Sequence, residues 1–299
     1  MFLIIGGESE IGGATYRAIK AKGEAVAATT RRSERVGPER PLLDLAVPLD
    51  SWEPPQGTTA VCLCAAVARL AACAADPEGT ARINVAQTLA LIDKLLARGI
   101  YVLFLSSNQV FDGRAPHVPV DAPYSPVSEY GRQKARTEAA LRERMTRGAP
   151  AAILRLAKVV SEKMPLVEGW IADLSNGKPI RAFHDMTLAP TPTDLVSAAI
   201  GSLLEDRAGG VFQLTGPRDV AYADVARFVA SYIGAEPSLV TETSALDAGL
   251  PRGATPVNTT LDSTLLDERY GYCAPDVWEV IVGAIPTSER RYGRTQNSG

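Results

Sequence analysis

The chain opens with Phe2-Leu3-Ile4-Ile5-Gly6-Gly7-Glu8-Ser9-Glu10-Ile11-Gly12, an apolar run that leads directly into a glycine-rich turn. The run predicts a buried strand, and residues 11–22, closed by Gly23, predict a helix. Glycines between a strand and a helix allow a tight turn, and they let a pyrophosphate approach the start of the helix. Ser9 stands where a middle glycine is usual and could donate to a phosphate. The alternative is a connecting turn that binds nothing.

Short apolar runs alternate with helical patterns through the first half of the chain. Further strands are predicted at 25–29, 42–45, 60–64, 101–105 and 151–156, and helices at 80–98 and 128–147. Alternation of this kind is typical of a parallel sheet with right-handed crossovers. We therefore expect an α/β fold, a Rossmann-like doubly wound parallel sheet with a smaller C-terminal α/β substrate lobe.

The second half has a different texture, with scattered prolines and glycines. Helices are predicted at 166–176, 193–204, 222–233 and 278–285, and short strands near Ile180 and Val211. The tail, 294–299, is expected to be frayed. The expected domains are a dinucleotide-binding domain over 1–157 and a mainly substrate-binding lobe over 158–299, from which some segments could return to the first domain.

Composition excludes several classes of protein. The 299 residues are 46% hydrophobic and 22% charged with a net charge of -3, so no overall positive field favours nucleic acid or an anionic membrane. Two histidines (His117, His184) and four cysteines (Cys62, Cys64, Cys73, Cys273) show no metal-ligand spacing, and the cysteines read as small reduced core residues. The start of the chain lacks a basic leader, and Arg69 interrupts the nearly uncharged stretch 58–75. We expect a cytoplasmic protein without a metal or a membrane span.

The end of the second predicted strand bears on the choice of cofactor. A carboxylate there would bind the ribose of NAD, but the chain reads Thr29-Thr30-Arg31-Arg32-Ser33. Two arginines suit the 2′-phosphate of NADP, although a solvated basic loop is the alternative. NADP is favoured and NAD stays possible. Asp44 is placed to touch the adenine, or to serve only as a turn residue.

Three polar side chains are expected to meet at the carboxyl ends of the strands. Ser106 and Ser107 end the strand at 101–105, and Tyr130 and Lys134 share one face of the following helix because they are four residues apart. A free tyrosine has a pKa of about 10, and a nearby ammonium favours the phenolate. The set predicts a hydroxyl, a phenol and an ammonium around one reacting group, with the pKa of Tyr130 lowered by Lys134 and a positively charged nicotinamide together.

These residues, with Asn84, resemble an extended short-chain dehydrogenase/reductase. Within that group, residues 106–113 (Ser-Ser-Asn-Gln-Val-Phe-Asp-Gly) are similar to the Ser-Thr-Asp-Tyr-Val-Phe-Asp-Gly stretch of dTDP-4-dehydrorhamnose reductases. Residues 183–195 and 211–216 resemble two later segments of the same branch, so the resemblance covers most of the chain. The family implies catalytic Ser107, Tyr130, Lys134 and Asn84. It also implies cofactor contacts at Gly6, Ser9, Glu10, Ile11, Gly12, Arg31, Arg32, Asp44, Leu45, Ala65, Ala66, Tyr130 and Lys134.

The resemblance also implies roles. Ser107 would polarise a carbonyl, Tyr130 would protonate its oxygen as hydride arrives, and Lys134 would hold the ribose. Asn84 would support the site or a relay water, unless it is only a satisfied polar residue within a helix. The implied reaction is NADPH-dependent reduction of a nucleotide-linked 4-keto-6-deoxysugar.

Departures from the family lie on the substrate side. Ser107 replaces a threonine, Asn108 and Gln109 replace an acidic and an aromatic residue, Met186 replaces a glutamine, and residues 157–161 lack an aromatic. His184 reads as a solvated loop residue or a nucleotide contact. Cations that could grip the substrate diphosphate are Lys158, Lys163, Arg181, Arg218 and Arg252.

Two alternatives stay open at this point. One is an epimerase or a dehydratase of the same fold; the arginine pair argues against an epimerase, and Asn108 with Gln109 argues against a dehydratase. The other is a non-catalytic NADP-binding regulatory subunit, as one relative of this branch is for methionine adenosyltransferase. A homodimer through the helices at 80–98 and 128–147 is possible.

Overall fold

The computed structural model describes residues 1–245, 247–250 and 255–287. Its first lobe is built on a six-stranded sheet in the order β10-β5-β4-β3-β1-β2, in which every neighbouring pair is parallel. The strands are β1 (Phe2–Ile5), β2 (Val26–Ala28), β3 (Ala60–Leu63), β4 (Tyr101–Ser107), β5 (Ala151–Leu156) and β10 (Gly210–Leu214). The strand order reverses at β1, the point at which open parallel sheets bind ligands, outside the carboxyl ends of their strands.

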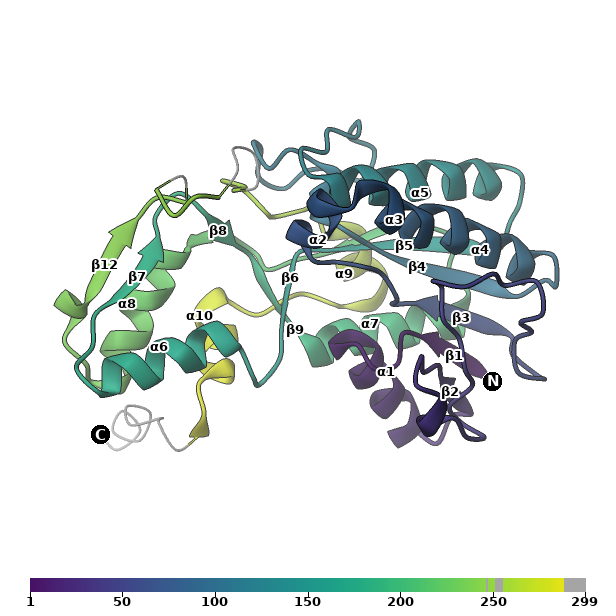
Figure 1. Cartoon of the computed structure of the whole chain (residues 1–299), viewed down its shortest axis with the longest axis horizontal. Coiled ribbons are helices and arrows are strands. Elements are labelled where there is room, and N and C mark those ends of the chain that lie inside the picture. Colours follow the sequence, from purple (N-terminus) through teal and green to yellow (C-terminus); the bar gives the residue numbers. More distant parts are fainter. Residues whose placement is uncertain (246, 251–254, 288–299) are drawn as a thin grey trace.

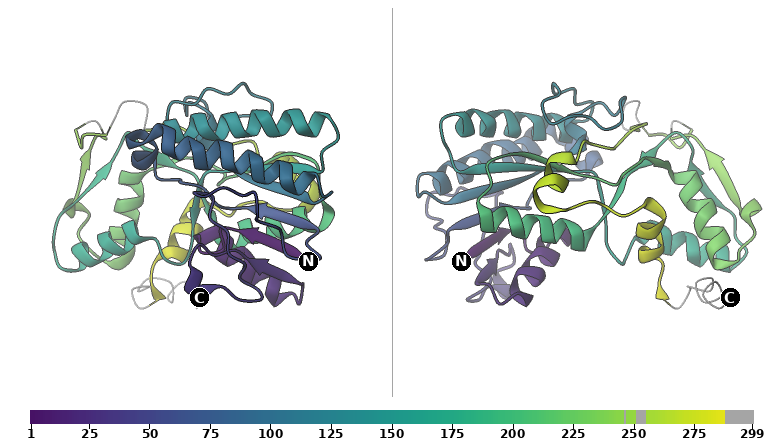
Figure 2. Two further views of the ribbon diagram at one scale, coloured as in Figure 1. Left: turned by 45° about the vertical axis from the view of Figure 1, so that its right-hand side comes forward. Right: turned by 180° about the vertical axis from the view of Figure 1, so that it is seen from behind.

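Helices cover both faces of this sheet (Figures 1 and 2). On one face α1 (Glu10–Ala21) packs against α7 (Thr193–Asp206), and their apolar residues join one core with the sheet. On the other face α4 (Thr88–Leu96) and α5 (Glu129–Thr146) form a second core. Shorter helical segments are α2 (Leu70–Ala75), α3 (Pro77–Ala81), α9 (Thr264–Tyr270), the 3₁₀ turns η1 (Ser33–Arg35), η3 (Asn108–Val110) and η4 (Pro237–Leu239), and the π-helical turn η2 (Arg82–Gln87).

The second lobe has its own core, at the left of Figure 1. Its helices are α6 (Pro165–Ser175), α8 (Tyr222–Ile233) and α10 (Val277–Ala284). Three two-stranded sheets complete it or join it to the first lobe: β7 (Ile180–Phe183) with β12 (Val240–Thr243), β8 (Thr187–Leu188) with β11 (Val220–Ala221), and β6 (Lys158–Val160) with β9 (Pro190–Pro192).

The chain passes between the lobes more than once. After β5 it forms β6, α6, β7 and β8, and then returns through β9 to α7 and β10. Strand β10 pairs with β5 at the edge of the central sheet, and α7 packs on α1. The chain then enters the second lobe through β11 and α8, and α9 contacts β10 on the way to α10.

The expected fold class is confirmed, and two element predictions are wrong. Residues 42–45 form no strand, because only Thr30 and Leu42 are bridged. The single helix expected at 80–98 is instead α3, η2 and α4 in succession. The expected frayed tail lies outside the described residues. Within the described part of the chain, no helix is long and apolar enough to cross a membrane, and no cluster of three or more possible metal ligands occurs.

Candidate active site

The glycine turn brings the chain backbone unusually close to itself. Gly6 has a φ of +90°, and a Cβ atom there would lie 2.8 Å from the backbone nitrogen of Ala65, just after β3. A Cβ atom on Gly12 would lie 2.4 Å from the Gly6 oxygen. Both contacts are too short for any side chain. The turn therefore needs glycine at these positions to seat the start of α1 against the ends of β1 and β3.

Ser9 caps helix α1. Its Oγ donates to the Gly6 oxygen at 2.7 Å and accepts from the Gly12 nitrogen at 3.0 Å, so the hydroxyl proton is used within the turn and not for a phosphate. Among the described residues, the N–H groups of Glu10 and Ile11 find no hydrogen-bond partner. Free donors at a helix N-terminus beside a tight glycine turn fit the pyrophosphate of a dinucleotide.

The arginines after β2 are arranged around one carboxylate. Glu8, in the glycine turn, lies 3.0 Å from Arg35 Nη1 and 3.7 Å from Arg32 Nε. Arg31 is exposed beside them and forms no ion pair with a described residue. Three guanidinium groups next to the turn suit a second phosphate, and Glu8 holds two of them in place.

The residues expected near the adenine form fewer specific contacts than those around the glycine turn. The Oδ1 atom of Asp44 accepts from the Ala46 nitrogen at 2.9 Å, as in a turn, and Leu45 is buried in the core. Ala65 and Ala66 follow β3 and are half-buried, with Ala65 against Gly6.

Lys134 is tied to the strand that carries Ser107. Its Nζ donates to the backbone oxygen of Leu105 at 2.7 Å, and it lies 4.3 Å from the ring centroid of Phe104 and 5.8 Å from that of Tyr130. The Oγ atom of Ser107 accepts from the Gln109 nitrogen at 3.2 Å. Ser107 and the Tyr130–Lys134 pair thus belong to neighbouring elements at the same edge of the sheet.

Burial controls the proton affinities of this pair. It lowers the pKa of Lys134 to about 8, an effect that the negative charge of Glu138 opposes. Burial raises the pKa of Tyr130 well above its ordinary value, with a smaller contribution from Cys73. The expectation that the pKa of Tyr130 is lowered is therefore wrong for the protein's own groups. The phenol therefore stays protonated at neutral pH.

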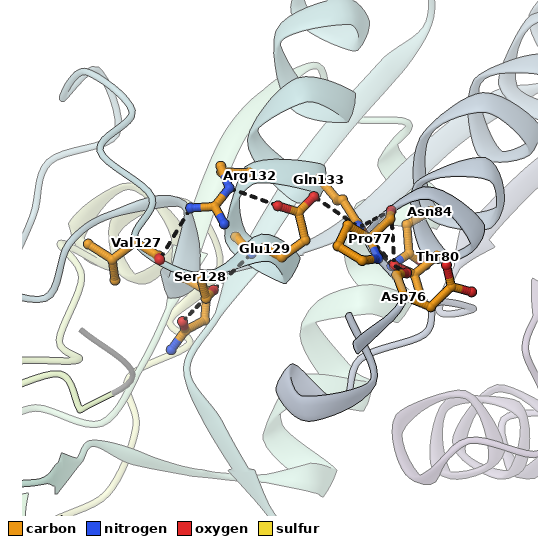
Figure 3. A network of polar contacts seen from close by, with 11 residues as sticks. Asp76, Pro77, Thr80, Asn84, Val127, Ser128, Glu129, Arg132 and Gln133 are labelled. Carbon is orange, nitrogen blue, oxygen red and sulfur yellow. Dashed lines mark hydrogen bonds and ion pairs between the residues drawn. The ribbon is translucent and has the colours of Figure 1, made fainter. Parts of the chain in front are cut away.

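Asn84 lies in the π-helical turn and belongs to a network of polar contacts (Figure 3). Its Oδ1 accepts from the Val67 nitrogen at 2.8 Å, and its Nδ2 donates to the Val67 oxygen at 2.9 Å and to Gln133 Oε1 at 2.7 Å. The side chain thus joins the loop after β3 to helix α5. The donors and the acceptor of the Asn84 side chain are thus used by protein groups. These bonds favour a role in supporting the site over a role in binding a relay water.

Gln133 completes the network and was not expected from the sequence. Its Nε2 donates to Thr80 Oγ1 at 2.9 Å, to the Pro77 oxygen at 3.2 Å and to Glu129 Oε1 at 3.2 Å (Figure 3). Gln133 lies between Tyr130 and Lys134 in the sequence, and its side chain is fully buried. Its hydrogen bonds fix α5 against α3. A polar residue inside the Tyr-x-x-x-Lys spacing was the only sequence signal for it.

The candidate diphosphate cations differ in their surroundings. Arg218 pairs with Asp276 at 3.0 Å, and Arg181 Nη2 donates to Thr243 Oγ1 at 2.8 Å. Lys158, Lys163 and His184 have exposed side chains, whereas Arg252 lies outside the described residues. A cleft of about 1100 Å³ runs from the glycine turn between α1, α7 and α10 and includes Lys163 in its lining, but not Ser107, Tyr130 or Lys134. The arrangement of Ser107, Tyr130 and Lys134 is therefore defined by its contacts and not by this cleft.

Comparison with known proteins finds a matching family model, several relatives and many similar solved structures. The model of the RmlD substrate binding domain matches residues 1–287. A probable low-salt glycan biosynthesis reductase from Haloferax volcanii is 26% identical over 71% of this chain and 72% of its own length. Methionine adenosyltransferase 2 subunit beta from Rattus norvegicus is 25% identical over 64% of this chain and 60% of its own length. The dTDP-4-dehydrorhamnose reductase of Bacillus anthracis, solved with NADP, has a TM-score of 0.76 at 16% identity, with 94% of this chain and 96% of that one covered.

Proposed function

Because the chain belongs to the RmlD substrate binding domain family, it is an NAD(P)-dependent oxidoreductase of the short-chain dehydrogenase/reductase type, and we propose that it reduces the keto group of a nucleotide-linked 4-keto-6-deoxysugar with NADPH. The observation that carries the proposal is the protonated Tyr130 beside the buried ammonium of Lys134, at the strand end that carries Ser107.

Each residue would have one task. The nicotinamide, when bound, supplies the hydride. Ser107 would hydrogen-bond the carbonyl oxygen and polarise it, once its hydroxyl proton turns from Asn108 Oδ1, to which it donates at 3.2 Å, towards the substrate. Tyr130 would donate the proton to that oxygen. Lys134 would hold the ribose hydroxyls, and its charge would stabilise the phenolate left behind.

NADPH is preferred over NADH in this proposal. Support comes from Arg32 and Arg35 around Glu8, from the exposed Arg31 beside them in sequence, and from the lack of a carboxylate at the end of β2, where NAD enzymes bind the ribose. On the substrate side, Asn108 and Gln109 stand where the family has an acidic and an aromatic residue. The sugar is therefore proposed only by its chemical class. Since such sugars and NADPH are cytoplasmic metabolites, the proposed location is the cytoplasm.

The proposal is tested by following NADPH absorbance with a panel of dTDP- and UDP-linked 4-ketosugars. We expect oxidation of NADPH with at least one of them and none with Tyr130→Phe. An epimerase of the same fold would interconvert sugars with no net consumption of NADPH.

A regulatory subunit is the second candidate, because one relative is a subunit of methionine adenosyltransferase. Its signature would be tight NADPH binding by both the wild type and Tyr130→Phe, with no oxidation of NADPH by any sugar of the panel. The Tyr130 phenol beside the buried Lys134 favours the enzyme, since a protein that only binds the cofactor has no need for a proton donor.

A further inference from the structure

A buried ion pair lies one helical turn beyond Lys134. Glu138 follows Lys134 by four residues on α5, so both side chains point from the same face of the helix. Arg155, from the middle of β5, places its Nη2 2.8 Å from Glu138 Oε2, and its Nε donates to both carboxylate oxygens at 3.0 and 3.2 Å. Neither side chain has any exposed surface. The pair therefore adjoins the catalytic lysine in the dry interior of the first lobe.

The surroundings fix both partners. Arg155 Nη1 donates to the Val120 oxygen and to Gln213 Oε1, each at 3.0 Å, and the guanidinium lies 5.0 Å from the ring centroid of Phe111. The Tyr124 hydroxyl donates to Glu138 Oε2 at 3.1 Å. With these bonds made, the carboxylate is held in one position beside the guanidinium.

Stability alone does not account for this pair. Desolvation of two buried charges offsets most of their attraction, and apolar residues of similar volume often serve a core equally well. What Glu138 provides at this position is a fixed carboxylate one helical turn from Lys134, whose charge favours the ammonium. The ammonium is itself buried, and its one hydrogen bond within the described residues goes to the Leu105 oxygen. The titratable groups around it are Glu138 and Tyr130 on α5 and Cys64 after β3.

We propose that Glu138 is a positioning residue for the hydride-transfer site, and that its carboxylate, held by Arg155, keeps Lys134 protonated so that the lysine can bind the cofactor ribose. The inference rests on the nicotinamide cofactor of the proposed function. Its direct consequence is a dependence of cofactor affinity on pH that the Glu138 charge sets. This dependence can be measured without any sugar substrate.

The test compares the wild type with the double variant Glu138→Gln, Arg155→Met, which removes both buried charges together and leaves neither unpaired. The dissociation constant of NADPH is measured by fluorescence titration from about pH 6 to about pH 9.5, a range that spans the pKa of Lys134. In the wild type the affinity falls as the pH rises past about 8. In the double variant we expect the fall to begin roughly one pH unit lower, so that affinity near pH 8 is up to about tenfold weaker.

A matched control is provided by another bidentate pair on the same helix. Arg144 of α5 contacts Asp93 of α4 at 2.6 and 2.7 Å, and it lies about 1.7 turns beyond Glu138 along the helix. The double variant Asp93→Asn, Arg144→Met should keep the wild-type profile. Glu138→Asp keeps the carboxylate, should also keep that profile, and serves as the decisive variant if the neutral pair does not fold.

A wild-type profile in the folded neutral variant overturns the inference and leaves the pair a structural one. A shifted profile in Glu138→Asp equally overturns it, because the charge is retained there. If the wild type binds neither NADPH nor NADH at any pH, the proposed function itself fails and the inference falls with it. The two failures are therefore distinct.

Discussion

A Cβ atom on Gly131 would lie 2.0 Å from the backbone oxygen of Gln109. Gly131 follows Tyr130 directly, and Gln109 lies two residues after Ser107. Ser128, the cap of α5, strengthens the same contact because its Oγ donates to Gln109 Oε1 at 3.1 Å and accepts from the Gly131 nitrogen at 3.0 Å. The start of α5 is thus seated on the turn after β4, which sets the spacing between the hydroxyl of Ser107 and the phenol of Tyr130.

The variant Gly131→Ala should lose both stability and activity. The added methyl group must push α5 away from η3, and overpacking of this kind costs about 1–3 kcal/mol. Thermal unfolding and NADPH oxidation measure the two effects. Gly169→Ala is the matched control, since Gly169 is exposed within α6 and a Cβ atom there meets nothing within 4 Å. The control should be stabilised by up to about 1 kcal/mol, and equal losses in both variants would contradict the argument.

Tyr130→Phe should lower kcat by about 10²- to 10⁴-fold, the range over which a positioned proton donor contributes. NADPH affinity should stay close to that of the wild type, as judged by fluorescence titration, because the ring and its packing remain. Tyr16→Phe is the control: its hydroxyl donates to Glu39 at 2.6 Å on the exposed side of α1. Near-normal turnover by Tyr130→Phe would show that another group delivers the proton.

The activity of the wild type should fall as the pH rises through about 8. Lys134, whose pKa burial lowers to about 8, is protonated below that pH and neutral above it. Burial raises the pKa of Tyr130, so the phenol stays protonated over the same range and adds nothing to the fall. A pH profile of kcat/KM checks this. Lys134→Met should be impaired at every pH and should lack this alkaline step; a step that persisted would belong to another group.

The double variant Arg31→Ala, Arg32→Ala should weaken NADPH binding more than NADH binding. Loss of charge-assisted bonds to the 2′-phosphate costs about 1.5–3 kcal/mol, or roughly 10- to 100-fold in affinity. Parallel titrations with the two cofactors measure the ratio. Arg147→Ala, an exposed arginine paired with Glu143 at the far end of α5, is the control. Equal loss of both cofactors would remove the argument for NADPH.

Local patterns were enough to predict the strands and helices of the central sheet. Apolar runs such as 101–105 and 151–156 became β4 and β5, because a strand buried on both faces must be continuous and apolar. The helix at 80–98 was misjudged for a reason that no local pattern reveals. Its π-helical turn carries Asn84, whose side chain bonds the backbone of Val67 in a distant loop, so a long-range contact decides the local geometry.

The residues of the candidate site also divide into those that a local sequence pattern predicts and those that depend on long-range contacts. The glycine turn and the Tyr130–Lys134 spacing are local signals, and both are present in the structure as tight, buried arrangements. Gln133 and the Glu138–Arg155 pair carry no local signal of comparable strength, because each polar side chain finds its partners on another element. The pKa of Tyr130 also needed the fold, since its direction is set by burial.

The repeated passage of the chain between its lobes limits how the protein can be divided. Cutting after β5 would strip the central sheet of its edge strand β10 and would leave the apolar face of α1 without α7. The second lobe accordingly cannot be exchanged for that of a relative by a single splice. A chimera that seeks a new sugar specificity must splice at both β6 and β9, and again after β10, or else graft individual side chains at the carboxyl ends of the strands.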